Sequence, residues 1–199
     1  MLSERIVVAA LGDSITAGTP YWDPDPAVQD SIGADLDPRC QWPYWAAEND
    51  DRLEFRNHGV NLERTDQIRS RLEDAVEGAD VLVVQGGIND VVQGRPAVET
   101  VEELRAMVRA GRDRGLRVVL VDVLPWNNGH PAHDTTINEL NAAIYAMAAE
   151  ENVSVIRFHD ALEDPQNPGT MRPEWTNDGN HPSVEGHKQL GGVFQLPDA

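Results

Sequence analysis

The sequence has few of the features that mark secreted, membrane or disulfide-rich proteins. Cys40 is the one cysteine among 199 residues, so no disulfide can form within the chain. No apolar run approaches the roughly 20 residues that span a bilayer. No basic region followed by an apolar segment marks a signal peptide near Met1. We therefore expect no membrane span and a cytoplasmic location, with secretion after processing left open.

Positive charge is also scarce. The chain has 16 basic residues against 34 acidic ones, a net charge of −18, and Lys188 is its one lysine. Nucleic-acid binding without sequence preference depends on neutralising phosphates, so this balance argues against a nucleic-acid partner and against anionic membranes. It favours neutral or cationic small-molecule substrates. The length and the hydrophobic fraction of 40% suit one domain, which we expect to cover residues 1–199.

Short apolar runs alternate with segments of helical spacing along most of the chain. Runs of this kind, closed by turn residues, are typical of strands buried in a parallel sheet. Strands that alternate with helices predict an α/β fold with helices on both faces of that sheet. The expected strands are Ile6–Leu11, Arg52–Asn57 (weaker and peripheral), Val81–Val84, Arg117–Leu124 and Val153–Phe158. The expected helices are Thr65–Val76 with Thr65 as its N-cap, Val98–Arg114 ending at Gly115, and Asp134–Glu151.

The segment Thr19–Gln41 is irregular. It contains four prolines and five aspartates, a composition that resists regular structure. We expect a long loop that leaves the carboxyl end of the first strand and passes near Ser14. Trp42-Pro43 then predicts the start of a helix with proline in its first turn.

The first strand stops abruptly at Gly12-Asp13-Ser14. Ser14 would then lie where a buried strand gives way to a helix, at the carboxyl edge of the sheet where open α/β folds bind ligands. A serine at this place suits a nucleophile, and it also suits a simple helix cap. A nucleophile needs a base within hydrogen-bond distance and a third group that orients the base.

Asp178 and His181 offer such a base and its orienting group. Asp178-Gly179 is a turn signal and His181 precedes a proline, so the two side chains would face each other across one tight turn. Asn89, in the glycine-rich segment after the third strand, could present its side-chain amide to an oxyanion at the same edge. Each pattern alone also fits a structural turn.

Together, these motifs resemble the GDSL family of esterases and lipases, also called SGNH hydrolases. No serine lies in the G-x-S-x-G context of the α/β-hydrolases. The matching residues are Gly12-Asp13-Ser14, Trp42-Pro43, Asn57-x-Gly59, Gly87-x-Asn89-Asp90, Asp178-x-x-His181-Pro182 and Ser183-x-x-Gly186-His187. They occur in order over residues 6 to 192.

The resemblance implies a three-layer α/β/α, flavodoxin-like fold with five parallel strands. It implies that Ser14 is the nucleophile, His181 the general base and then acid, and Asp178 the residue that orients His181. Asn89 and the backbone N–H of Ser14 would serve the oxyanion hole. The family usually has a second glycine in its N-x-G-x-x-G block, where this chain has Leu62, so the third donor is expected to be Leu62 or Gly59.

The implied reaction is hydrolysis of short-chain acyl or aryl esters through an acyl-enzyme, with no cofactor and no metal. Carbohydrate acetylesterase and lysophospholipase or thioesterase activities are alternatives within the family. A non-catalytic carbohydrate- or protein-binding module is an alternative of another class. A flavin-binding protein is disfavoured, because Asp13 would repel a phosphate.

Each of the remaining candidate residues fits a structural role as well as a functional one. His130 and His133 could form a metal pair but fit an exposed loop better, since no third ligand is near in sequence. We expect Asp13 and Asp90 to hold their loops and His187 to be structural. The tryptophans at 22, 42, 45 and 126 could line an acyl or sugar pocket or belong to the core or a lid.

Overall fold

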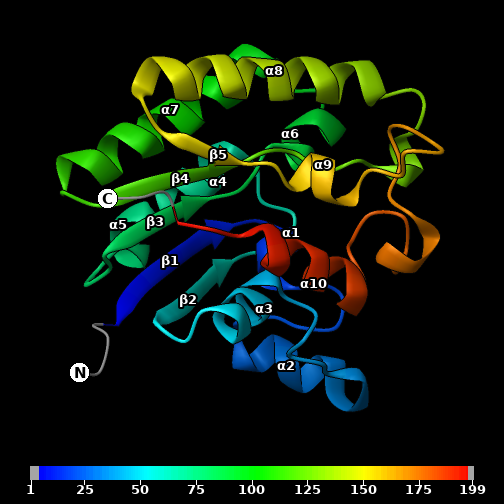
Figure 1. Cartoon of the computed structure of the whole chain (residues 1–199), viewed down its shortest axis with the longest axis horizontal. Helices are drawn as coiled ribbons and strands as arrows, with labels where there is room; N and C mark the ends of the chain where they lie inside the picture. Colours follow the sequence, from blue (N-terminus) through cyan, green and yellow to red (C-terminus); the bar gives the residue numbers. More distant parts are fainter. Residues whose placement is uncertain (1–4, 197–199) are drawn as a thin grey trace.

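The computed structural model describes residues 5–196 and contains a five-stranded, all-parallel sheet in the order β2-β1-β3-β4-β5. Helices cover both faces of this sheet, as Figure 1 shows. The expected α/β fold with five parallel strands is therefore confirmed, with β2 at one edge as predicted. The strands are β1 (Ile6–Gly12), β2 (Leu53–Gly59), β3 (Val81–Val84), β4 (Arg117–Val121) and β5 (Ser154–Ile156).

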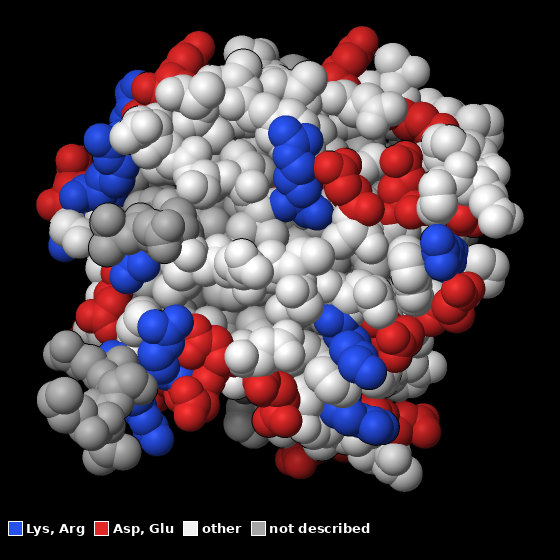
Figure 2. Space-filling view, in the orientation of Figure 1, with Lys and Arg blue, Asp and Glu red and all other residues white. Residues whose placement is uncertain are grey.

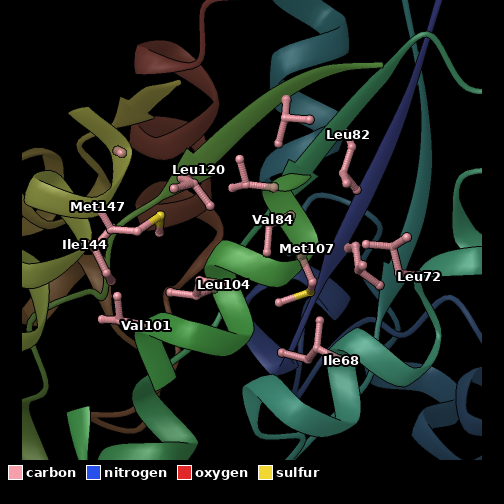
Figure 3. Packing of buried hydrophobic residues seen from close by; sticks show 14 of the residues in the cluster. Ile68, Leu72, Leu82, Val84, Val101, Leu104, Met107, Leu120, Ile144 and Met147 are labelled. Atoms are coloured by element: carbon pink, nitrogen blue, oxygen red, sulfur yellow. The ribbon is translucent and has the colours of Figure 1, made fainter. Parts of the chain in front are cut away.

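One face of the sheet packs against four helices. These are α4 (Thr65–Ser70), α5 (Leu72–Ala75), α7 (Ala97–Asp113) and α8 (Asp134–Glu151). Their apolar side chains meet alternate residues of the central strands, such as Leu82 and Leu120, in one buried cluster (Figure 3). The helical spacing in the sequence predicted this burial: Ile68, Leu104 and Ile144 are fully or almost fully buried.

The opposite face packs against α3 (Trp42–Asn49), α9 (Phe158–Leu162) and α10 (Val184–Val193). Val8, Ala10 and Val83, the alternate residues of their strands, contribute to this second cluster. The indole of Trp42 is fully buried there and stacks on Phe194 at 5.2 Å between ring centroids. Of the roles considered for the tryptophans, Trp42 therefore has that of a core residue. α3 begins at Trp42-Pro43, as expected.

β4 is shorter than the predicted strand Arg117–Leu124. It ends at Val121; Asp122 still donates its N–H to the carbonyl of Ile156 at 3.4 Å, but the backbone of Val123 bonds to a side chain instead of a strand. The amide of Asn141 on α8 bonds both the N–H and the carbonyl of Val123 at 2.8 Å, as a neighbouring strand would. The apolar run thus continues as buried chain, because a side chain from α8 satisfies its backbone.

The predicted helix Thr65–Val76 is interrupted. It forms two short helices, α4 and α5, that meet at Arg71. The N-cap is Arg64 rather than Thr65, because Thr65 turns inward and its hydroxyl donates to the buried Asp90 at 2.8 Å. Tertiary contacts therefore overrode the local capping preference.

The segment Thr19–Gln41 also differs from expectation. It contains α2 (Pro26–Ile32) and the short 3-10 helix η1 (Gly33–Asp35). Asp25 caps α2 by accepting a hydrogen bond from the N–H of Ala27 at 2.8 Å, and Pro26 occupies its first turn. The proline and aspartate that argued against regular structure thus begin a helix instead. The segment lines a separate cavity with Gly59 and Val60, and none of its residues lines the cavity at Ser14.

Within residues 5–196, no helix is both long and apolar enough to cross a membrane. The excess of acidic residues forms no single-sign surface on the face drawn in Figure 2, where arginines lie beside carboxylates. The remaining short elements are the helices α1 (Ser14–Ala17) and α6 (Ile88–Val92) and the 3-10 helices η2 (Asn127–Gly129) and η3 (Pro173–Trp175). η2 follows β4, and η3 follows α9.

Candidate active site

Ser14 is the first residue of α1, directly beyond the end of β1. The N-cap is Asp13, whose Oδ1 accepts a hydrogen bond from the N–H of Ile15 at 2.9 Å. Asp13 therefore fills the capping role that the sequence left open for Ser14, and the Ser14 hydroxyl is free for another partner. The residue is 5% exposed and lines a cavity.

That partner is His181. Its Nε2 lies 3.2 Å from Ser14 Oγ, and its Nδ1 lies 2.8 Å from Asp178 Oδ2. The three side chains form the serine–imidazole–carboxylate relay that nucleophilic catalysis needs. The structure thus brings together residues that lie 167 positions apart in the chain.

A tight turn holds Asp178 toward the imidazole. Its Oδ1 accepts the backbone N–H groups of Asn180 and His181, both at 2.8 Å. Burial alone would raise the pKa of Asp178, but hydrogen bonds from the side chain and backbone of His181 and from Asn180 outweigh it and lower that pKa. The carboxylate is therefore ionised at neutral pH and able to stabilise a protonated imidazole.

Asn89 lies on α6 and lines the same cavity. Gly87, with φ of 124°, makes the turn from β3 into this helix. One side-chain N–H of Asn89 donates to the carbonyl of Glu63 at 2.9 Å. That bond fixes the amide, and the second N–H bonds to no group within residues 5–196, so it is available to a ligand.

The two expected third donors occupy different positions. Gly59 ends β2, its N–H donates to Asn57 Oδ1 at 2.9 Å, and it lies outside the Ser14 cavity. A Cβ at Gly59 would come within 2.0 Å of the backbone nitrogen of Ala17, so close packing on α1 explains the glycine. Leu62 lines the cavity in a left-handed conformation with φ of 67°, and its N–H bonds to no residue of the described chain.

The cavity at Ser14 has a volume of about 190 Å³. Apolar side chains from α1, α6 and two loops line it together with Ser14, Asn89, Asn180 and His181. These apolar residues are Ile15, Leu62, Ile88, Val92 and Trp126. Of the tryptophans considered from the sequence, Trp126 alone contributes to it. Trp22 lines the cavity beside α2, and Trp45 on α3 lies next to Lys188 of α10.

Asp13 and Asp90 are both fully buried near the site. Asp90 accepts hydrogen bonds from Thr65 and Arg95, which ties the start of α4 to α6. Burial raises the pKa of Asp13 to about 7, against the opposing hydrogen bonds from Ile15 and Gln85. Both side chains contact loops, as the sequence suggested, and neither lines the cavity.

His130 and His133 have partners other than a metal. His130 Nδ1 lies 2.8 Å from Asp134 Oδ2, and the His133 ring packs against Trp126. Among residues 5–196, no group of three or more His, Cys, Asp or Glu side chains is arranged to hold a metal ion. No sequence pattern pointed to Asn180, Asn128 or Arg71, whose contacts at the site come from tertiary packing.

Comparison with known proteins gives the family. Residues 10–189 match the GDSL-like lipase/acylhydrolase family, so the chain belongs to it. No curated protein sequence matches the chain.

Solved structures share the fold at low sequence identity. A lipolytic protein of the G-D-S-L family from Desulfitobacterium hafniense is 23% identical, with a TM-score of 0.77 over 96% of this chain and 97% of that one. A lipase/acylhydrolase from Enterococcus faecalis is 22% identical, with a TM-score of 0.73 over 95% and 92%. An acetyl xylan esterase is 20% identical, with a TM-score of 0.74 over 94% and 97%.

Proposed function

We propose that the protein hydrolyses esters of short acyl chains through an acyl-enzyme on Ser14. The observation that carries this is the relay from Ser14 Oγ to His181 Nε2 and from His181 Nδ1 to Asp178. His181 removes the hydroxyl proton as Ser14 attacks the ester carbonyl, and it then gives that proton to the leaving alcohol. Water, deprotonated by His181, releases the acid.

Three donors surround the place where the oxyanion forms. These are the N–H of Ser14 at the start of α1, the free side-chain N–H of Asn89 and the N–H of Leu62. Ser14, Asn89 and Leu62 line one cavity, which supports this assignment over Gly59. Such donors are worth several kcal/mol because they bind the oxyanion more strongly than the substrate carbonyl.

The cavity volume supports small substrates. About 190 Å³ lies below the usual range of ligand pockets, so an acetyl or butyryl group suits it better than a long chain. An acetylated carbohydrate satisfies the same limit, because its acyl group is the smallest. Carbohydrate deacetylation is therefore the second candidate, and the structurally similar acetyl xylan esterase agrees with it in fold.

The test compares the wild-type protein with Ser14→Ala. We expect turnover of p-nitrophenyl acetate in the wild type and loss by at least about 10³-fold in the variant. An organophosphate should add one mass label to the wild type and none to Ser14→Ala. Equal turnover or equal labelling of both proteins would refute the proposal, and acetyl release from acetylated xylan distinguishes the second candidate.

A further inference from the structure

Trp126 lines both the Ser14 cavity and a second, much smaller cavity. The second cavity, of about 10 Å³, shares Ile15, Ile88, Trp126 and Asn180 with the first. Its remaining walls are mainly apolar and come from Val123, Leu124 and Pro125, the chain that follows β4, together with Gln85. Trp126 thus contributes to the walls of both the nucleophile's cavity and a small, mainly apolar recess.

Three contacts fix the indole in this position. Its Nε1–H donates to Asn180 Oδ1 at 2.6 Å, and its ring lies 5.0 Å from the His133 ring between centroids. The ring also covers Gly129, where a Cβ would approach the indole Cε3 within 2.0 Å. Gly129 is therefore the residue that leaves room for the ring, and the indole is a fixed wall rather than a mobile lid.

The hydrogen bond to Asn180 also links the indole to the turn that carries Asp178 and His181. Asn128, two residues after Trp126, donates to the carbonyl of Asp178 at 2.8 Å and to Asn180 Oδ1 at 2.9 Å. The wall and the Asp178–His181 turn are thus held as one unit. An acyl chain that displaced the indole would have to break these hydrogen bonds. Its displacement would therefore cost more free energy than the loss of packing contacts alone.

We propose that Trp126 sets the upper length of the acyl chain that the site accepts, at about four carbons. This inference rests on the proposed ester hydrolase function. The substrate class is esters of acetic to butyric acid, whose acyl group fits beside Ile88 and Val92 without moving the indole. Removing the ring joins the cavity to the recess and admits medium chains.

The test measures kcat/KM for p-nitrophenyl acetate, butyrate and octanoate. In the wild type the octanoate-to-acetate ratio should be low, and in Trp126→Leu it should rise at least about tenfold, because a pocket discriminates by about that factor or more for each methylene it excludes. Trp126→Phe, which keeps a ring but loses the N–H, should raise the ratio about threefold and serves if the leucine variant does not fold. Trp45→Leu is the matched control, since Trp45 also donates its indole N–H to a carbonyl but lies outside the cavity.

An unchanged ratio in the folded variants would overturn the inference, as would an equal rise in Trp45→Leu. Binding of octanoate by calorimetry gives a readout that needs no turnover. We expect Trp126→Leu to bind octanoate at least about tenfold more tightly than the wild type does, and equal affinity would also overturn the inference. A wild type that hydrolyses none of the esters refutes the proposed function, and the calorimetric comparison then decides the role of Trp126 by itself.

Discussion

Arg71 and Glu63 form an ion pair at 2.7 Å that closes the loop carrying Leu62 onto the end of β1. The same guanidinium donates to the carbonyl of Gly12 at 3.2 Å and to that of His58 at 2.9 Å. Glu63 in turn offers its carbonyl to the Asn89 amide. Two of the three proposed oxyanion donors, Leu62 and Asn89, therefore depend on one arginine for their position.

Arg71→Ala should lower kcat for p-nitrophenyl acetate by about 10- to 100-fold and change KM by less than about threefold, because misplaced donors weaken transition-state binding more than substrate binding. Arg71→Lys should recover part of the loss, since an ammonium can reach Glu63 but cannot bond all three partners. Arg69→Ala is the control, as Arg69 pairs with Glu103 away from the cavity. A fall in melting temperature with unchanged kcat would show that Arg71 is structural only.

Leu62 makes a second prediction because its backbone is left-handed. Leu62→Gly should keep the donor in place and retain at least about half of the wild-type kcat, since glycine adopts a φ of 67° freely. Leu62→Val should cost about 1–2 kcal/mol of unfolding free energy and lower kcat, because a β-branched residue is more strained there. Urea denaturation and ester kinetics of the two variants measure this, and a valine variant as active and stable as the glycine variant would contradict it.

The strands were predictable because the sheet is parallel and buried on both faces. Val81–Val84 is apolar throughout since neighbours on both sides exclude water from it. The weaker, alternating run Arg52–Asn57 fits the edge position of β2, where part of the strand faces solvent. Local pattern and burial agree at these places, so the sequence alone is informative.

The sequence-based predictions failed where contacts between residues far apart in the chain, rather than local patterns, determine the structure. The interruption at Arg71 follows no break in the apolar spacing, since Leu72 and Val76 are both buried as the spacing predicts. The approach of Trp126 to Asn180 joins positions 54 residues apart, and no local pattern encodes it. By contrast, Asp178 and His181 are three positions apart in one turn, which is why their approach could be expected from the sequence.

The buried carboxyl of Asp13 should make the free energy of unfolding fall as the pH rises. Its pKa is about 7 in the folded chain, above the ordinary value of 3.8, so the folded state binds a proton more tightly than the unfolded state does. The stabilisation is complete below about pH 4 and is lost as the pH passes 7. Asp13→Asn keeps a capping side chain without the charge. Its free energy of unfolding relative to that of the wild type should rise by about 2–3 kcal/mol between about pH 5 and pH 8.

Urea denaturation of both proteins at the two pH values measures this difference. The exposed Asp74→Asn is the control, and its stability should follow the wild type at both pH values. A difference between Asp13→Asn and the wild type that does not grow with pH would contradict a buried, protonated Asp13.

His187 predicts the opposite dependence. Its ring is fully buried on α10, and within the described chain neither ring nitrogen has a hydrogen-bond partner. Burial, with a smaller contribution from His181, lowers the pKa of His187 to about 3 from 6.5. The unfolded chain therefore binds the extra proton, and this stability is present above about pH 6.5 and lost as the pH falls toward 3.

His187→Leu removes the titrating group and keeps a similar volume. Its stability relative to the wild type should rise by about 2 kcal/mol between about pH 8 and pH 5, because the wild type must keep an imidazole neutral against a growing driving force for protonation. Urea denaturation at the two pH values measures the change. Parallel losses in both proteins would show that His187 is protonated, or exposed to water, in the folded state.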